Sequence, residues 1–93
     1  MEIQIDPHTL ERAIERDTDE DEIKDVLNTG FSVLAKYNRL GKAKIYDFKQ
    51  ERNGKYYEQK RVEVFYTIER NVIITVTVYV FYGKWEEEDA NRV

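Results

Sequence analysis

The sequence predicts an α+β fold: two N-terminal helices followed by a four-stranded antiparallel β-meander, with the helices packed on one face of the sheet. Up to Gly30 the apolar residues recur with helical spacing, and from Phe31 onward they alternate with a period of two. Short connections between the later segments make consecutive strands antiparallel neighbours. We expect residues 1–93 to form a single domain, with a core over about 5–84 and an acidic C-terminal tail over 85–93.

Two helix starts are visible before Gly30. Asp6-Pro7 places an N-cap acceptor before a proline, which suits the first helical position, so the first helix should run from there to about Asp17. Thr18 or Asp19 should cap the second helix, whose first turn is acidic. Gly30 is expected to end that helix in a left-handed conformation. The predicted apolar stripes are Leu10, Ala13 and Ile14 in the first helix, and Ile23, Val26 and Leu27 in the second.

The predicted strands are Phe31–Tyr37, Ala43–Gln50, Tyr56–Glu69 and Val72–Tyr82. Asn53-Gly54 is the strongest hairpin signal in the chain. Parity in the last two strands predicts a core face made of Val62, Val64, Tyr66, Ile68, Val72, Ile74, Val76, Val78 and Val80. The other face is expected to be open, at least in part, and to carry Arg61, Glu63, Phe65, Thr67, Thr75, Thr77, Tyr79 and Phe81, with Ile73 as an apolar exception.

Composition narrows the classes of function. The chain has no cysteine and one histidine, which excludes a disulfide or thiolate metal site and argues against a conventional zinc site. We therefore expect no metal and no cofactor. The start MEIQID does not resemble a signal peptide, and no segment approaches the roughly 20 apolar residues of a membrane helix. A cytoplasmic protein without membrane contact is expected.

Charge is distributed unevenly along the chain. Residues 1–30 carry a net charge of −7, residues 31–84 carry +6 and residues 85–93 carry −3. A basic segment rich in aromatic residues indicates affinity for nucleic acid. The overall charge of −4 argues against strong, indiscriminate binding.

His8, Arg12 and Arg16 are spaced four residues apart. On a helix this spacing puts an imidazole and two guanidinium groups on one face, as a site for an anion would require. The same row is also compatible with an ordinary solvated helix face, in which Arg12 pairs with Glu15, and Arg16 pairs with Asp19 or Glu20.

The row, the acidic second helix ending at Gly30 and the strand start Ile73-Ile74-Thr75-Val76 together resemble a family of small bacterial and archaeal domains of unknown function, related to the RelE-like and BrnT-like ribonuclease toxins of toxin–antitoxin systems. The resemblance covers most of residues 5–80. Two departures are the acidic overall charge, since such toxins are usually basic, and the acidic segment Trp85–Asp89.

The resemblance implies metal-independent cleavage of mRNA, in which a 2′-hydroxyl attacks the adjacent phosphate. His8 would then act as general base or acid, and Arg12 and Arg16 would hold the phosphate. The candidate substrate-binding residues are Tyr46, Thr75 and Tyr79. The expected partners are RNA and an antitoxin protein.

Phe65, Tyr79 and Phe81 leave two further interpretations open. Exposed aromatic residues on a sheet commonly mark an interface, so this face could form a homodimer or receive an antitoxin without any catalysis. Together with Lys44, Lys60 and Arg61 they could instead stack the bases of single-stranded RNA without cleaving it.

Overall fold

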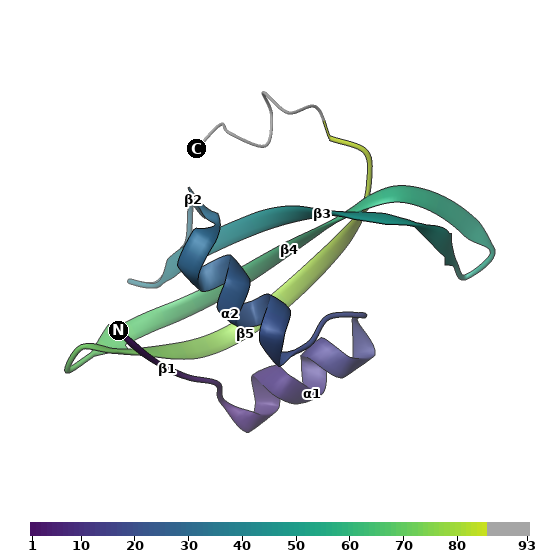
Figure 1. Ribbon diagram of the computed structural model, residues 1–93. Coiled ribbons are helices and arrows are strands. Elements are labelled where there is room, and N and C mark those ends of the chain that lie inside the picture. Colours follow the sequence, from purple (N-terminus) through teal and green to yellow (C-terminus); the bar gives the residue numbers. More distant parts are fainter. Residues whose placement is uncertain (86–93) are drawn as a thin grey trace.

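The computed structural model describes residues 1–85 and confirms the α+β class, with two helices and one mixed five-stranded sheet (Figure 1). The sheet order is β1-β5-β4-β3-β2. The predicted acidic tail lies outside the described residues, apart from Trp85. The elements in chain order are β1 (Glu2–Gln4), α1 (Pro7–Glu15), α2 (Glu20–Thr29), β2 (Phe31–Val33), β3 (Leu40–Arg52), β4 (Lys55–Glu69) and β5 (Val72–Gly83).

The predicted sheet extended its first strand to Tyr37, whereas β2 ends at Val33, and it lacked β1. This strand pairs in parallel with β5, with Ile3 opposite Ile73, whereas the other three pairings are antiparallel as expected. Only one of its three residues is apolar, so the local pattern does not mark it as a strand. Its partners lie about seventy residues later in the chain, and only the tertiary fold brings them together.

Three pairs of consecutive residues have positive φ and turn the chain between strands. They are Tyr37-Asn38, Asn53-Gly54 and Arg70-Asn71. The second and third are the two-residue connections of the β3–β4 and β4–β5 hairpins, and two successive left-handed residues are the mark of a type I′ turn. The hairpin predicted at Asn53-Gly54 is therefore confirmed.

Both helix starts are confirmed. The Asp6 carboxylate accepts from the backbone N–H of His8 at 2.9 Å, and the Asp19 carboxylate accepts from that of Glu22 at 2.8 Å. The stripe predicted for α1 was wrong in part. Its buried residues are Thr9 and Ala13, whereas Ile14 is 76% exposed. Small residues face the sheet because α1 lies close beside β5 (Figure 1).

The core lies between the helices and the sheet. The buried stripe predicted for α2 is confirmed, and β4 supplies most of the opposing surface. The core residues are Ala13, Ile23, Val26, Leu27, Val62, Val64, Tyr66 and Val78, with Ile3, Ile5, Tyr46, Ile73 and Val80 packed against them.

A bulge in β5 overturns the predicted parity of that strand. Phe65 pairs with Thr77 but Tyr66 pairs with Thr75, so Val76 is an extra residue in β5. Residues after the bulge keep the predicted faces, and Val78 is buried. Before the bulge the faces exchange, so Ile73 and Thr75 point to the helices. The core positions predicted for Val72, Ile74 and Val76, and the open-face positions predicted for Ile73 and Thr75, were therefore wrong. Ile68, also predicted in the core, is 44% exposed.

Gly30 ends α2 but not in the expected conformation. Its φ of −75° and ψ of 171° are extended, so the predicted left-handed cap was wrong. Instead the chain needs a glycine because two backbones meet there. A Cβ atom at this position would lie 2.5 Å from the Val26 carbonyl oxygen and 2.6 Å from that of Ala43. The helix end is thus held directly against β3.

The close approach at Gly30 predicts a steric cost for any side chain. We expect Gly30→Ala to lower the free energy of unfolding by about 1–3 kcal/mol, measured by urea denaturation, because neither carbonyl can move away freely. Gly83→Ala is the matched control, since its Cβ would meet only the Trp85 ring at 3.6 Å. Equal stability of the two variants would contradict this role of Gly30.

Candidate nucleic-acid interface

The sheet face opposite the helices carries an aromatic row, which we define as Phe65, Tyr79 and Phe81. Phe65 lies on β4 and the other two on β5, and the cross-strand register places all three on this face, called here the open face. The Phe65 and Tyr79 ring centroids are 5.9 Å apart, and those of Tyr79 and Phe81 are 6.4 Å apart. Tyr79 is 42% exposed and Phe81 is 48% exposed. The predicted open placement of the row is thus confirmed.

Cationic side chains lie within the aromatic row and beside it. The Arg16 guanidinium lies over the Tyr79 ring, 5.2 Å from its centroid, and its Nη1 donates to the Val78 carbonyl at 2.6 Å. Arg61 lies over the Phe31 ring at 5.3 Å and donates to Glu63 at 2.9 Å. Glu63 is the cross-strand neighbour of Tyr79, so a half-buried ion pair borders the row.

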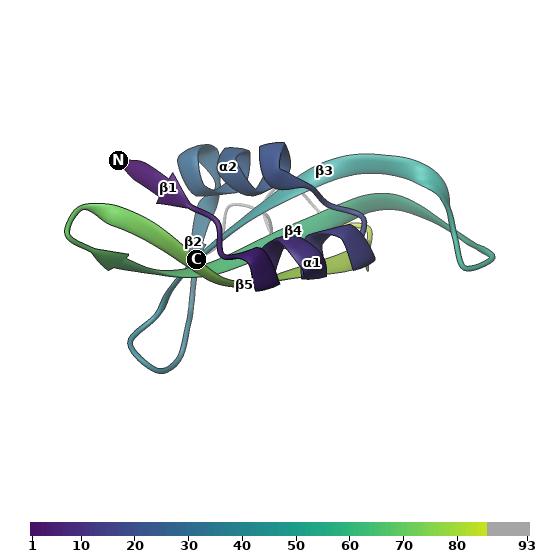
Figure 2. The same cartoon turned by 90° about the horizontal axis from the view of Figure 1, so that it is seen from below.

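The β2–β3 loop, residues 34–39, projects on the same side as the open face (Figure 2). Between this loop and the sheet lies a pocket of about 280 Å³. Its lining residues are Leu34, Ala35, Lys36, Tyr37, Arg39, Phe65, Thr77 and Tyr79. The pocket therefore joins two aromatic-row residues to two loop cations.

The His8, Arg12 and Arg16 row does not converge on one point, because each side chain has a different partner. His8 Nδ1 lies 3.9 Å from Glu11, and Arg12 is 3.3 Å from Glu15, as the solvated-face interpretation expected. The expected pairing of Arg16 with Asp19 or Glu20 is absent from the ion pairs of residues 1–85. Arg16 alone connects this row with the open face, through Tyr79.

Tyr46 and Thr75 lie on the helix side of the sheet, apart from Tyr79. The Thr75 hydroxyl is buried and accepts from the Asp6 backbone N–H at 3.0 Å, fixing the start of α1. The Tyr46 hydroxyl donates to Asp25 on α2 at 2.6 Å. The three predicted substrate-binding residues are therefore divided between two faces, and only Tyr79 is near the aromatic row.

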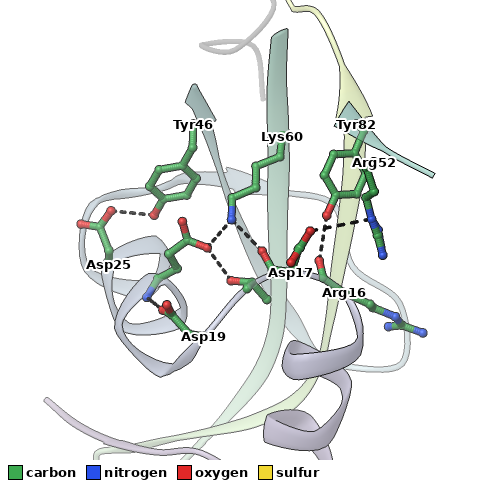
Figure 3. Close-up of polar contacts among 10 residues, drawn as sticks. Arg16, Asp17, Asp19, Asp25, Tyr46, Arg52, Lys60 and Tyr82 are labelled. Atoms are coloured by element: carbon green, nitrogen blue, oxygen red, sulfur yellow. Dashed lines mark hydrogen bonds and ion pairs between the residues drawn. The ribbon is translucent and has the colours of Figure 1, made fainter. Parts of the chain in front are cut away.

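Lys44 and Lys60 were expected beside the open aromatic residues, and this placement was wrong. Both reach the acidic helix α2 instead, and Figure 3 shows the contacts of Lys60. Lys60 Nζ is buried and donates to Glu22 and to the Asp17 carbonyl, each at 2.7 Å, while Lys44 Nζ donates to Asp25 at 2.7 Å. These contacts attach α2 and the α1–α2 connection to the sheet.

Asp25 accepts from three side chains, which favour its ionised form. The hydrogen bond from Lys44, followed by that from Tyr46, lowers the pKa of Asp25 from 3.8 to about 2. Burial, and then the hydrogen bond to Asp25, raises the pKa of Tyr46 well above its usual value. Asp25, Lys44 and Tyr46 thus form a charged clamp between α2 and β3.

Sequence reasoning missed the loop side of this surface. Lys36, Tyr37 and Arg39 fall in a segment that the period of two assigned largely to a strand, and Glu63 was placed on the open face without a role. The Tyr37-Asn38 turn has no glycine to signal it, unlike Asn53-Gly54. Lys36 and Arg39, which flank that turn, were the available signal for a binding loop.

Comparison with known proteins identifies the family of this chain. The family described as a domain of unknown function, DUF4258, matches residues 5–80. No curated protein and no solved structure matches the chain. Within residues 1–85, no helix is long and apolar enough to cross a membrane, and no group of three or more His, Cys, Asp or Glu residues is placed to hold a metal ion.

The Asp25 clamp predicts a specific acid sensitivity. A carboxylate with a lowered pKa stabilises the fold above its unfolded pKa, and this contribution is lost as pH falls through the folded value. We expect the native protein to lose stability between about pH 4 and pH 2, whereas Asp25→Asn should start less stable and change less over that window. Urea denaturation at stepped pH measures this.

Asp21→Asn on the same helix is the control, since Asp21 has no ion pair among residues 1–85. It should follow the native curve. An Asp25→Asn curve parallel to the native one would disprove the clamp.

Proposed function

Since this chain belongs to the DUF4258 family, whose function is unknown, we propose its function from its own surface. We propose that it is a RelE- or BrnT-like domain that binds single-stranded RNA on the open face. The observation that carries the proposal is the aromatic row, with a guanidinium over Tyr79 and two loop cations beside it.

Stacking supplies the first part of the binding energy. The exposed rings of Tyr79 and Phe81 lie on one strand with an interplanar angle of 27°, so bases of an extended strand have two similarly oriented surfaces to stack on. Base stacking on an aromatic side chain contributes about 1–3 kcal/mol per base and tolerates any sequence. Two such contacts support binding in the micromolar range only when phosphate contacts add to them.

Phosphate contacts come from the cations on and beside this face. Arg16, Lys36 and Arg39 surround the row, and among residues 1–85 none of them is within 4.0 Å of a carboxylate. The lysines of the helix face are occupied by acids of α2, so they add little to this surface. The RNA affinity of this acidic protein would therefore lie on the open face.

RNA binding is expected to depend on the exposed rings. By fluorescence anisotropy with a labelled single-stranded RNA, Tyr79→Ala and Phe81→Ala should each weaken binding about 5- to 150-fold, the equivalent of one lost stack. The native affinity should fall steeply with salt. Tyr56→Ala is the matched control, because Tyr56 is 51% exposed but lies at the start of β4, by the hairpin turn.

Two results would contradict RNA binding on this face. One is the absence of binding at low salt. The other is a light-scattering mass above the 11.2 kDa monomer that Phe81→Glu returns to monomer without any change in RNA affinity. That second result would assign the row to a homodimer or to an antitoxin contact instead.

Cleavage of the bound RNA is the second candidate function, and Arg16 is the observation that favours it. Arg16 belongs to the row implied by the family resemblance and also contacts the aromatic row. In this reaction the 2′-oxygen attacks the adjacent phosphorus while its proton passes to a base. The bond to the 5′-oxygen breaks and that oxygen takes up a proton, leaving a 2′,3′-cyclic phosphate. Arg16 would stabilise the phosphorane charge. The proton transfer that the resemblance assigns to His8 would require its side chain to leave Glu11 and turn toward Arg16.

Cleavage predicts growth arrest on induced expression and cyclic-phosphate products from mRNA in the presence of EDTA. His8→Ala should lower the cleavage rate about 10²- to 10⁴-fold, as loss of a general acid or base does, and should relieve the arrest. His8 is exposed, so its replacement leaves the fold intact. Arg70→Ala, in the exposed β4–β5 turn, is the control. Full activity of His8→Ala would remove His8 from the mechanism, and harmless expression of the native chain would remove cleavage.

A further inference from the structure

The β2–β3 loop is held in a defined but costly conformation. The Arg39 backbone N–H donates to the Lys36 carbonyl at 3.2 Å, and the two residues between them, Tyr37 and Asn38, have φ values of 60° and 59°. This is a type I′ geometry, which asparagine, aspartate and glycine favour and an aromatic residue does not. Residues held against their preference cluster at binding sites. The turn leaves the Tyr37 side chain 83% exposed.

The pocket behind this turn has the chemistry of a nucleotide site. Tyr37, Phe65 and Tyr79 supply aromatic surface, while Lys36 and Arg39 supply positive charge from the two ends of the turn. Thr77 adds a hydroxyl group that can donate to or accept from a base edge. Neither loop cation has a carboxylate within 4.0 Å among residues 1–85.

The size of the pocket limits its occupant. Its volume of about 280 Å³ lies just below the range of ligand pockets, which starts at about 300 Å³. It therefore suits a single nucleotide and not a folded RNA element or a peptide helix. Aromatic rings together with cations favour a group that is flat at one end and anionic at the other.

We infer that this pocket is a nucleotide subsite, in which one base of the RNA stacks on the aromatic lining and its phosphate is held by Lys36 and Arg39. The subsite rests on the proposed RNA-binding function and deepens it. The rest of the RNA passes over Tyr79 and Phe81. The loop thus fixes the position of one nucleotide on a face that otherwise stacks bases without preference.

The first test is a titration of the full chain with single nucleotides, followed by ¹H–¹⁵N NMR. Each of the four 5′-ribonucleoside monophosphates is added separately, with inorganic phosphate and an unphosphorylated nucleoside as further arms. We expect the amide resonances of residues 34–39 and of Thr77 to shift when a monophosphate is added. Inorganic phosphate alone or the nucleoside alone should cause smaller shifts. Shifts that inorganic phosphate reproduces in full would overturn the subsite, because they indicate a simple anion site.

The second test compares RNA affinities of loop variants. Tyr37→Asn removes the ring and places a residue in the turn that prefers positive φ, so it should fold well and weaken RNA binding about 5-fold or more. Lys36→Ala with Arg39→Ala should weaken binding about tenfold and reduce the slope of log affinity against log salt by about 1. The control pair, Lys24→Ala with Lys49→Ala, removes the same charge from exposed positions outside the pocket.

The outcomes separate the subsite from the function on which it rests. RNA binding that both loop variants retain at native strength, with no mononucleotide shifts, overturns the subsite and leaves RNA binding intact. Mononucleotide shifts without RNA binding overturn the function and leave the pocket as a site for free nucleotides only. Loop amides that shift with protein concentration alone, before any nucleotide is added, overturn the subsite in favour of contact with a second copy of the chain.

Discussion

The extra residue at Val76 in β5 is the constraint on which the arrangement of the sheet depends. β5 must pair with β4 along its length and with β1 at its start, and it must also present side chains to the helices throughout. The bulge exchanges the faces partway along the strand. Thr75 can therefore receive the start of α1, while Tyr79 and Phe81 remain on the opposite side. Without it, the start of β5 would direct Ile73 away from the core.

Because the helices cover only one face of the sheet, the charged side chains divide between its two faces. The acidic α2 lies on the helix face and is neutralised there by lysines of β3 and β4, through the Lys44–Asp25 and Lys60–Glu22 pairs. The buried lysine is tolerated because it donates to a carboxylate and to a carbonyl at once. Two acids of α2 and two lysines of the sheet thus neutralise each other on the helix face, whereas Arg16, Lys36 and Arg39 lie on or beside the open face.

Arg16 connects α1 with the aromatic row on the open face. It ends α1, donates to the exposed edge of β5 at Val78, and covers the Tyr79 ring. The Tyr82 hydroxyl in turn donates to the Arg16 carbonyl at 3.0 Å. A guanidinium placed by two contacts, on a backbone held by a third, loses little conformational freedom when it meets a phosphate, which is the advantage of a preorganised site. His8 and Arg12, on the same helix face, remain in surface ion pairs and lack this support.

The sequence by itself determined the features that depend on neighbouring residues. These are the caps at Asp6 and Asp19, the buried stripe of α2, the Asn53-Gly54 hairpin and the order of the antiparallel strands, because short-range spacing and turn chemistry decide them. Tertiary structure decided what depends on distant partners. Val72, Ile73 and Ile74 are all apolar, so alternation does not tell which of them face the core. Only the pairing with β4 reveals the bulge. The parallel β1 strand, the two backbones that meet at Gly30 and the pocket under Tyr37 likewise join segments far apart in the chain, and no local pattern records them.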